Sequence, residues 1–220
     1  MSIAPETPMR QNAPAAVGGL VDAIGGVATA ILAICGLVNI NPPVMIAAAT
    51  IVFGVALLLQ GGACMAEFTQ AARTSGRVVD MEPGGNLAAI LLVGAAGVVL
   101  GILSLLGIDA NVMIPSAVIA FGVAMILGSS LLPQLHAMRQ AAQPGLQRRL
   151  AGSEIFVSQI ASGSAVGQSL AGLAAIVLGI LVLAGLNHPA LILVALLELG
   201  ATLVITGGAL TAAILGAMQP

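Results

Sequence analysis

Residues 85–133, GNLAAILLVGAAGVVLGILSLLGIDANVMIPSAVIAFGVAMILGSSLLP, decide the fold of this chain. They contain two apolar runs, 85–108 and 112–133, which are separated only by residues 109–111. With a helical rise of about 1.5 Å per residue, each run is long enough to cross a hydrocarbon core about 30 Å thick. Because the connection is so short, the two helices must be antiparallel neighbours. The stretch therefore predicts a transmembrane helical hairpin.

Similar apolar runs lie on both sides of this hairpin, at 16–38 and 43–66 before it and at 164–187 and 189–217 after it. Each flanking pair is also joined by a short turn, whereas the other connections are long and polar. We therefore expect an all-α integral membrane protein with six transmembrane helices in three tandem helical hairpins. The expected parts are an N-terminal tail (1–15), a first hairpin (16–66), a loop (67–84), a second hairpin (85–133), a second loop (134–163) and a third hairpin (164–217).

The composition is typical of a chain that is solvated by lipid. Of its 220 residues, 59% are hydrophobic and 6% are charged, whereas about 25% are charged in an ordinary soluble domain. A soluble globule of this size could not cover its own surface, so water-soluble enzymes and nucleic-acid-binding proteins are excluded. Trp, Tyr and Lys are absent, and the aromatic belt that holds many helices at the lipid headgroups cannot be built.

All the basic residues fall on one side of the expected arrangement. They precede the first run or lie in the two long connections, at Arg10, Arg73, Arg77, Arg139, Arg148 and Arg149. Basic residues accumulate on the cytoplasmic side of membrane proteins. We therefore expect a multi-pass protein of the cell inner (plasma) membrane, with both termini and both long loops cytoplasmic and the three short turns outside.

The three hairpins resemble one another in sequence. Residues 31–37 align with 102–108 and with 180–186, each just ahead of a turn, and the returning runs carry Gly54, Gly122 and Gly200 at matching places. In this register small residues four apart recur in every first helix, as Gly26 with Ala30, Gly97 with Gly101 and Ala175 with Gly179. Such pairs let helix backbones approach closely in lipid. We expect a parallel internal repeat, whose copies are related by an axis along the membrane normal.

Glu198 is the ionisable residue that lies deepest in an apolar run. It follows Pro189 by nine residues, a rise of about 13 Å, which places it near the middle of a bilayer. An ionisable group there costs at least about 2.5 kcal/mol by insertion scales, so it should face protein or a cavity and is a candidate functional residue. Thr202 and Thr206 share its helix face and are the expected polar partners. A structural role, in which a neutral Glu198 ties helices together, is equally open.

Three other polar residues within the apolar runs are candidates for a role in packing or function. Asp22 is a second ionisable candidate, a few residues inside the cytoplasmic end of the first run. Water or a snorkelling contact would reach it there, and a helix N-terminus would favour its charge, so a structural role is expected. Gln60 and Thr50 lie in the second run and are expected to form hydrogen bonds between helices.

The sequence contains no arrangement typical of a metal, cofactor or catalytic site. His136 and His188 flank the runs without a further ligand at a suitable spacing. Cys35 and Cys64 lie in apolar stretches and are interpreted as small hydrophobic residues. We expect a chain that is not an enzyme, binds neither metal nor nucleic acid and needs no cofactor. A lipid or a hydrophobic pigment held between helices stays open.

The connection 134–163 allows two structures. Apolar residues beside Arg148, Glu154 and Gln159 would suit a short interfacial helix. Alternatively, Ser153 and Glu154 cap a helix that runs directly into the membrane, with Gly163 as a weak point.

Three functions are compatible with these features. The first is a non-catalytic membrane subunit that packs through small-residue helix faces with copies of itself or with other membrane subunits. The second is a channel or transporter for a proton, an ion or a small solute that uses Glu198. The third follows from a resemblance in architecture: triple hairpins with one mid-membrane Glu198 are similar to the ring-forming proteolipids of rotary ATPases. The dense glycine repeat of their first helix and their polar hairpin loop are not found here.

Overall fold

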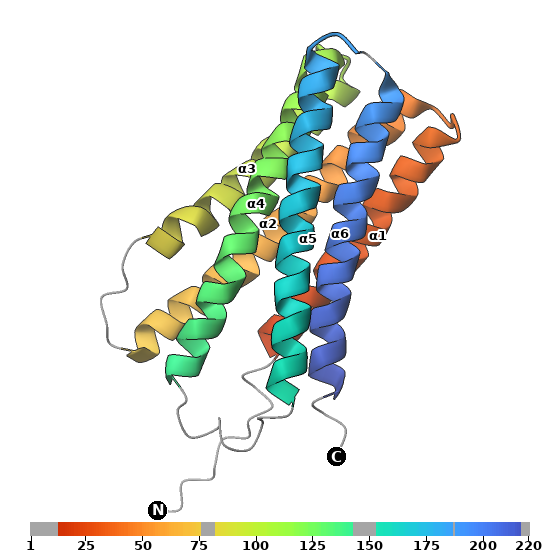
Figure 1. Ribbon diagram of the computed structural model, residues 1–220. Coiled ribbons are helices and arrows are strands. Elements are labelled where there is room, and N and C mark those ends of the chain that lie inside the picture. The colour runs from red at the N-terminus through yellow and green to blue at the C-terminus, as the bar shows by residue number, and fades with distance from the viewer. Residues whose placement is uncertain (1–12, 76–81, 143–152, 187, 217–220) are drawn as a thin grey trace, which may run out of the picture.

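A computed structural model of the protein describes residues 13–75, 82–142, 153–186 and 188–216. These residues form six helices and no strand. The helices are α1 (Ala13–Leu37), α2 (Pro42–Ser75), α3 (Glu82–Leu105), α4 (Ala110–Ala142), α5 (Ser153–Leu183) and α6 (Pro189–Gly216). They form an elongated bundle with the turns α1–α2, α3–α4 and α5–α6 at one end (Figure 1). All six are long and apolar enough to cross a membrane, which agrees with the expected all-α membrane fold.

The three turns are built in the same way. The helix that precedes each turn (α1, α3 or α5) ends in a Schellman motif. In this motif one backbone N–H donates to the carbonyl five residues earlier: Ile40 to Cys35, Ile108 to Leu103 and Leu186 to Leu181. The residue before each donor has a positive φ, at Asn39 (69°), Gly107 (81°) and Gly185 (106°). Glycine and asparagine are the residues that adopt this conformation most readily.

These turns correct the sequence alignment of the first hairpin. The expected alignment paired Leu32 with Leu103, but the hydrogen bonds make Cys35 the residue that corresponds to Leu103 and Leu181. The expected register of the first helix was therefore wrong by three residues. A shift of three residues is close to one helical turn, so it leaves the pattern of small and apolar residues on a helix face almost unchanged. Apolar sequence similarity alone could not detect it.

The bundle has three inner and three outer helices. The inner helices α2, α4 and α6 contact one another, and each outer helix lies between two of them. Helix α1 packs between α6 and α2, α3 between α2 and α4, and α5 between α4 and α6. Each outer helix packs most extensively on an inner helix of a neighbouring hairpin, so the hairpins are interleaved.

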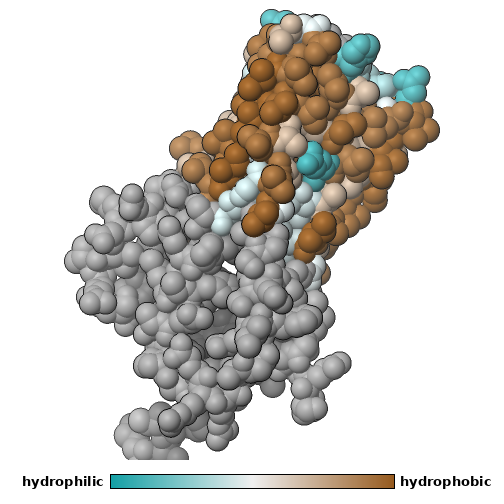
Figure 2. All heavy atoms as spheres, viewed as in Figure 1, coloured by the Kyte–Doolittle hydropathy of each residue, from teal (hydrophilic) through white to brown (hydrophobic). Residues whose placement is uncertain are grey.

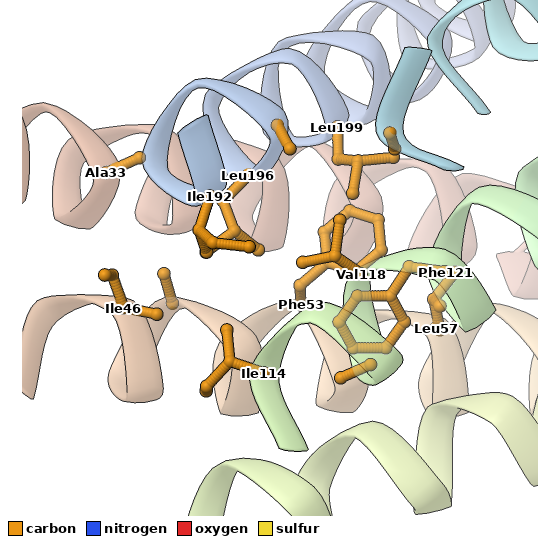
Figure 3. Packing of buried hydrophobic residues seen from close by; sticks show 14 of the residues in the cluster. Ala33, Ile46, Phe53, Leu57, Ile114, Val118, Phe121, Ile192, Leu196 and Leu199 are labelled. Carbon is orange, nitrogen blue, oxygen red and sulfur yellow. The ribbon is translucent and has the colours of Figure 1, made fainter. Parts of the chain in front are cut away.

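Apolar side chains fill the space between the inner helices in layers. Each layer takes one residue from α2, α4 and α6, and all are buried: Ile46, Ile114 and Ile192; Ala49, Ala117 and Ala195; Phe53, Phe121 and Leu199; Leu57, Met125 and Leu203. Figure 3 shows the isoleucines and the Phe53–Phe121 contact, whose ring centroids lie 4.7 Å apart. No sequence feature used above had identified these layers.

The outer surface of the described bundle is also apolar (Figure 2). Ile24, Leu92 and Leu170 occupy matching positions on α1, α3 and α5 and are 61%, 71% and 62% exposed. Monomeric soluble proteins rarely expose apolar surface of this extent. An apolar outer surface of this kind is typical of helical membrane proteins.

Three helices extend well beyond the apolar runs. Helix α2 continues to Ser75 and α4 to Ala142, so parts of the expected loops are helical. Helix α5 begins at Ser153 and is continuous through Gly163. This continuous helix is the one expected in the second of the two structures considered for the connection 134–163, of which residues 143–152 lie outside the described residues.

Candidate functional site

Glu198 lies on the outward face of α6. Val194, Ala201 and Ile205 lie four residues before it and three and seven residues after it, which places all four on one face. Ala201 is exposed, and Val194 and Ile205 are 44% and 66% exposed. Glu198 itself is half-buried, and no described residue forms a hydrogen bond or an ion pair with its carboxyl group. The carboxyl group belongs to the outer surface of the single chain, not to its core.

The two threonines expected to partner Glu198 bond instead to their own helix. The Thr202 hydroxyl donates to the backbone carbonyl of Glu198 at 2.8 Å, and that of Thr206 donates to the carbonyl of Thr202 at 2.9 Å. Hydroxyl groups in apolar helices commonly bond to the carbonyl four residues earlier, because no water is available. Both threonine hydroxyl groups therefore donate their protons within α6, and neither links the Glu198 carboxyl group to another helix.

Thr50 and Gln60 likewise form no described bond between helices. Thr50 is buried and donates to the backbone carbonyl of Ile46 at 2.8 Å, within α2. The expectation that Thr50 bridges helices was wrong for this reason. Gln60 is half-buried, one turn beyond Ala56 on the same helix.

Asp22 is buried, contrary to the expectation that water or a snorkelling contact reaches it. The residue is 7% exposed, and its Oδ1 atom has no hydrogen-bond partner. One turn later α1 packs so closely that a Cβ at Gly25 would lie 2.6 Å from the Ala56 Cβ, and one at Gly26 would lie 2.6 Å from the Gly200 carbonyl oxygen. Helix α1 is thus packed tightly between α2 and α6, and this packing buries the Asp22 side chain.

Gln168 is a second buried polar residue that sequence reasoning missed. It is 4% exposed, and its Oε1 atom has no hydrogen-bond partner. Gln168 precedes Leu181 by thirteen residues, just as Asp22 precedes Cys35 by thirteen, so the two occupy the same position in α5 and α1. The three-residue error in the alignment had hidden this equivalence. An alignment that starts from the positive-φ residues of the turns would have found it.

One polar contact crosses between helices close to Gln168. The Oγ atoms of Ser129 on α4 and Ser169 on α5 lie 2.8 Å apart, and Ser129 donates to the Ile126 carbonyl at 2.7 Å. Either hydroxyl could be the donor in the contact between the two serines. The close approach of α4 and α5 at Gly122 and Gly172 lies seven residues before Ser129 and three residues after Ser169.

Glycines lie at the closest approaches between hairpins. Gly26 faces Gly200, Gly54 faces Gly94 and Gly122 faces Gly172, each with its missing side chain directed at the partner's backbone carbonyl. Gly101 and Gly179 lie against α2 and α4 at the matching residues Ala47 and Pro115. The other expected packing residues are also internal: Gly97 lies against Phe121, Ala175 is buried and Ala30 lies next to Gly200. Gly94 and Gly172 were not identified from the sequence.

In the residues that the structure describes, no group of three or more His, Cys, Asp and Glu side chains is arranged to hold a metal ion. Cys35 and Cys64 are half-buried thiols on α1 and α2. Comparison of the chain with models of protein families, with curated proteins and with solved structures finds no match in any of the three.

Proposed function

We propose that this chain is a non-catalytic membrane subunit that assembles with copies of itself or with other membrane proteins through the outer face of α6. The observation that carries the proposal is the position of Glu198 among Val194, Ala201 and Ile205 on this face. In a lone protomer, an ionisable group near the middle of the apolar span would face lipid. A second protein against α6 would remove that exposure and supply the missing hydrogen-bond partner.

The proposed subunit consists of three tandem hairpins that point the same way across the membrane. The shared turn geometry, the matched apolar layers and the glycine contacts between hairpins support this internal repeat. The proposed orientation places both termini on the cytoplasmic side of the inner membrane, because all the arginines lie at that end of the chain's hairpins. The absence of Trp and Tyr also favours anchoring by neighbouring proteins over anchoring by an aromatic belt.

A channel through the axis of one chain is the less favoured function. The described inner helices fill their shared axis with apolar layers from Ile46 to Leu57, so a polar path along it is not present there. A route for a proton or an ion would instead pass between chains, along the outer face of α6. This second candidate, which includes a proteolipid-like ring, is favoured only by the outward position of Glu198.

Particle mass and flux together test the proposal. Solubilised in mild detergent, the wild-type protein should form particles well above its 21.6 kDa protomer. Glu198→Leu should reduce the assembled fraction, and Glu198→Gln should retain more of it because the amide still forms hydrogen bonds. Val52→Leu, at the matching position of α2, is the control and should assemble as the wild type does. A stable lone protomer with no associated protein contradicts the proposal. Proton or cation flux in liposomes that Glu198→Gln abolishes would favour the second candidate.

A further inference from the structure

Each inner helix exposes one face between its two outer neighbours, and the face on α6 differs from the other two in its charge. The matching exposed residues of α2, α4 and α6 are Val55, Val123 and Ala201. Three residues earlier, the half-buried residues at the matching positions are Val52, Ala120 and Glu198. A carboxyl group at this depth needs a polar partner, because lipid offers none. The carboxyl group therefore distinguishes the α6 face as the one that requires a specific neighbour.

The same face of α6 has room for a closely packed helix. Ala201 is exposed, and a Cβ atom added at Gly208 would meet nothing within 4 Å among the described residues. At Gly200, where α1 packs, the added Cβ would lie 2.9 Å from the Gly26 carbonyl oxygen. Small residues let helix backbones approach closely in lipid. A neighbouring helix can therefore come close enough to α6 to reach the Glu198 carboxyl group.

The apolar runs of the chain contain no basic residue that could pair with Glu198. Lysine is absent, and all six arginines lie outside these runs. Arg73 lies twenty-one residues beyond Val52 on α2, and Arg139 lies nineteen residues beyond Ala120 on α4, a rise of about 30 Å in each case. An arginine side chain is much shorter than this rise. Neither arginine therefore reaches the level of Glu198, in this chain or in a copy inserted the same way.

The threonine hydroxyl groups near this level do not replace a positive partner. Each donates its proton at 2.8 Å to a backbone carbonyl of its own helix: Thr29 to Gly25, Thr50 to Ile46 and Thr202 to Glu198. The amide of Gln60 is also remote, because Gln60 lies eight residues beyond Val52, a rise of about 12 Å. Two copies of the chain that met symmetrically through this face would place one Glu198 against the other, and like charges repel. A second copy is therefore a poor partner for this face.

We infer that the neighbour on the outer face of α6 is a different membrane protein, whose transmembrane helix places a lysine or an arginine against Glu198. Ionisable residues inside membranes commonly pair with one another, and hydrogen bonds between charged groups are stronger than those between neutral groups. One chain binds one such helix, because α2 and α4 have Val52 and Ala120 in place of the carboxylate. This inference rests on the proposed assembly through α6 and adds the chemistry of the partner to it.

Synthetic transmembrane peptides are the probe for this chemistry. Three peptides rich in leucine and alanine, each about twenty residues long, differ only in a central lysine, glutamine or leucine. Their binding to the protein in phosphatidylcholine vesicles is measured by energy transfer from a donor dye on Val38→Cys, with Cys35 and Cys64 replaced by alanine. We expect the lysine peptide to bind about tenfold more tightly than the leucine peptide, with the glutamine peptide between them.

Substitutions of Glu198 decide whether this preference depends on its charge. Glu198→Leu should bind the three peptides equally, and Glu198→Lys should prefer a fourth peptide with a central glutamate to the lysine peptide. Val52→Leu, on the matching face of α2, is the control and should keep the preference of the wild type. A lysine peptide that binds the wild type no more tightly than the leucine peptide overturns the inference, and so does a preference that persists in Glu198→Leu.

Cross-linking from Ala201→Cys in native membranes separates the inference from the proposed function. A product of twice the protomer mass that contains only this chain would overturn the inference and leave the assembly through α6 intact. A product with another protein supports the inference when mass spectrometry locates the cross-link on a transmembrane helix that contains lysine or arginine. A cross-linked helix without either residue contradicts the inference but not the assembly. The absence of any product would contradict the proposed function and, with it, the inference.

Discussion

Individual glycines set how closely the hairpins approach. At Gly54 a Cβ atom would lie 2.9 Å from the Gly94 carbonyl oxygen, and at Gly94 it would lie 2.9 Å from the Gly54 carbonyl oxygen. The contact is therefore reciprocal, and the atoms that would clash belong to backbone. A flexible side chain could move aside, but two packed helix backbones can separate only together. Close packing of this kind replaces the hydrophobic driving force that is missing between helices in lipid.

The substitution Gly54→Ala should therefore destabilise the bundle. We expect a loss of about 1–3 kcal/mol, the usual cost of overpacking, measured by unfolding in a detergent and denaturant series. Gly62→Ala is a matched control on the same helix, because a Cβ at Gly62 meets nothing within 4 Å. It should leave stability unchanged or raise it slightly through better helix propensity. Equal effects of the two substitutions would refute the role assigned to the Gly54–Gly94 contact.

At this scale the sequence predicted which residue types matter better than it predicted their partners. Glu198, Asp22 and the packing glycines were identified because charges and small residues are conspicuous in apolar runs. The hydroxyl partners were wrong, since Thr50 and Thr202 bond to their own helices. Gln168 was missed because its burial depends on how α5 packs against α4 and α6, and one helix sequence does not contain that information.

At the scale of elements, the turns are the most regular part of the molecule. Asn39, Gly107 and Gly185 all adopt a positive φ and end their helices with the same hydrogen bonds. Two of the three are glycine, which has no steric penalty in this conformation. For other residues this conformation costs about 1–2 kcal/mol of conformational free energy, and the cost is smaller for asparagine than for most.

Substitutions at the second turn test this account. Gly107→Ala should lower the unfolding free energy by about 1 kcal/mol, since the alanine Cβ is strained at a φ of 81° although nothing lies within 4 Å of it. Asn39→Gly in the first turn should cause no loss. Both can be compared by thermal unfolding in the same detergent. A neutral Gly107→Ala would mean that the positive φ is not required for the hairpin to close.

The element boundaries were largely predictable, and the helix register was not. The apolar runs and the polar turn residues between them predicted six helices in their order along the chain, because the bilayer thickness sets the minimum length of each run. The sequence did not show that α2 and α4 continue as helices to Ser75 and Ala142, where hydropathy falls but the helix propensity persists. The register of α1 was wrong by three residues, since interchangeable Ile, Leu and Val side chains fit several registers.

For the whole molecule, the interleaved hairpins divide the helices into an apolar inner set and an outer set whose surface is also apolar. The inner layers from Ile46 to Leu203 close the axis of the described bundle. The polar residues Asp22 and Gln168 are buried in the half of the bundle away from the turns, whereas Glu198 lies on the outer face of α6. Hydropathy alone could not locate either group relative to the other helices, because every helix is apolar on all sides.

The proposed orientation predicts which segments are reached from outside the cell. With Cys35 and Cys64 replaced by alanine, a cysteine at Val38, which is 68% exposed in the first turn, should react with a membrane-impermeant maleimide in intact cells. A cysteine at Gly145 in the arginine-bearing connection should react only after permeabilisation. The reverse pattern of labelling would show that the orientation is inverted.

The most direct test of the account is cross-linking from the outer face of α6 in native membranes. Ala201→Cys is made with Cys35 and Cys64 replaced, and Val55→Cys and Val123→Cys at the matching, exposed positions of α2 and α4 serve as controls. If α6 contacts a second protein next to Glu198, a thiol-specific cross-linker should join the Ala201→Cys chain to a copy of itself or to a distinct protein far more efficiently than it joins the controls. A cross-linking yield at Ala201→Cys no higher than at Val55→Cys and Val123→Cys would contradict the proposed assembly.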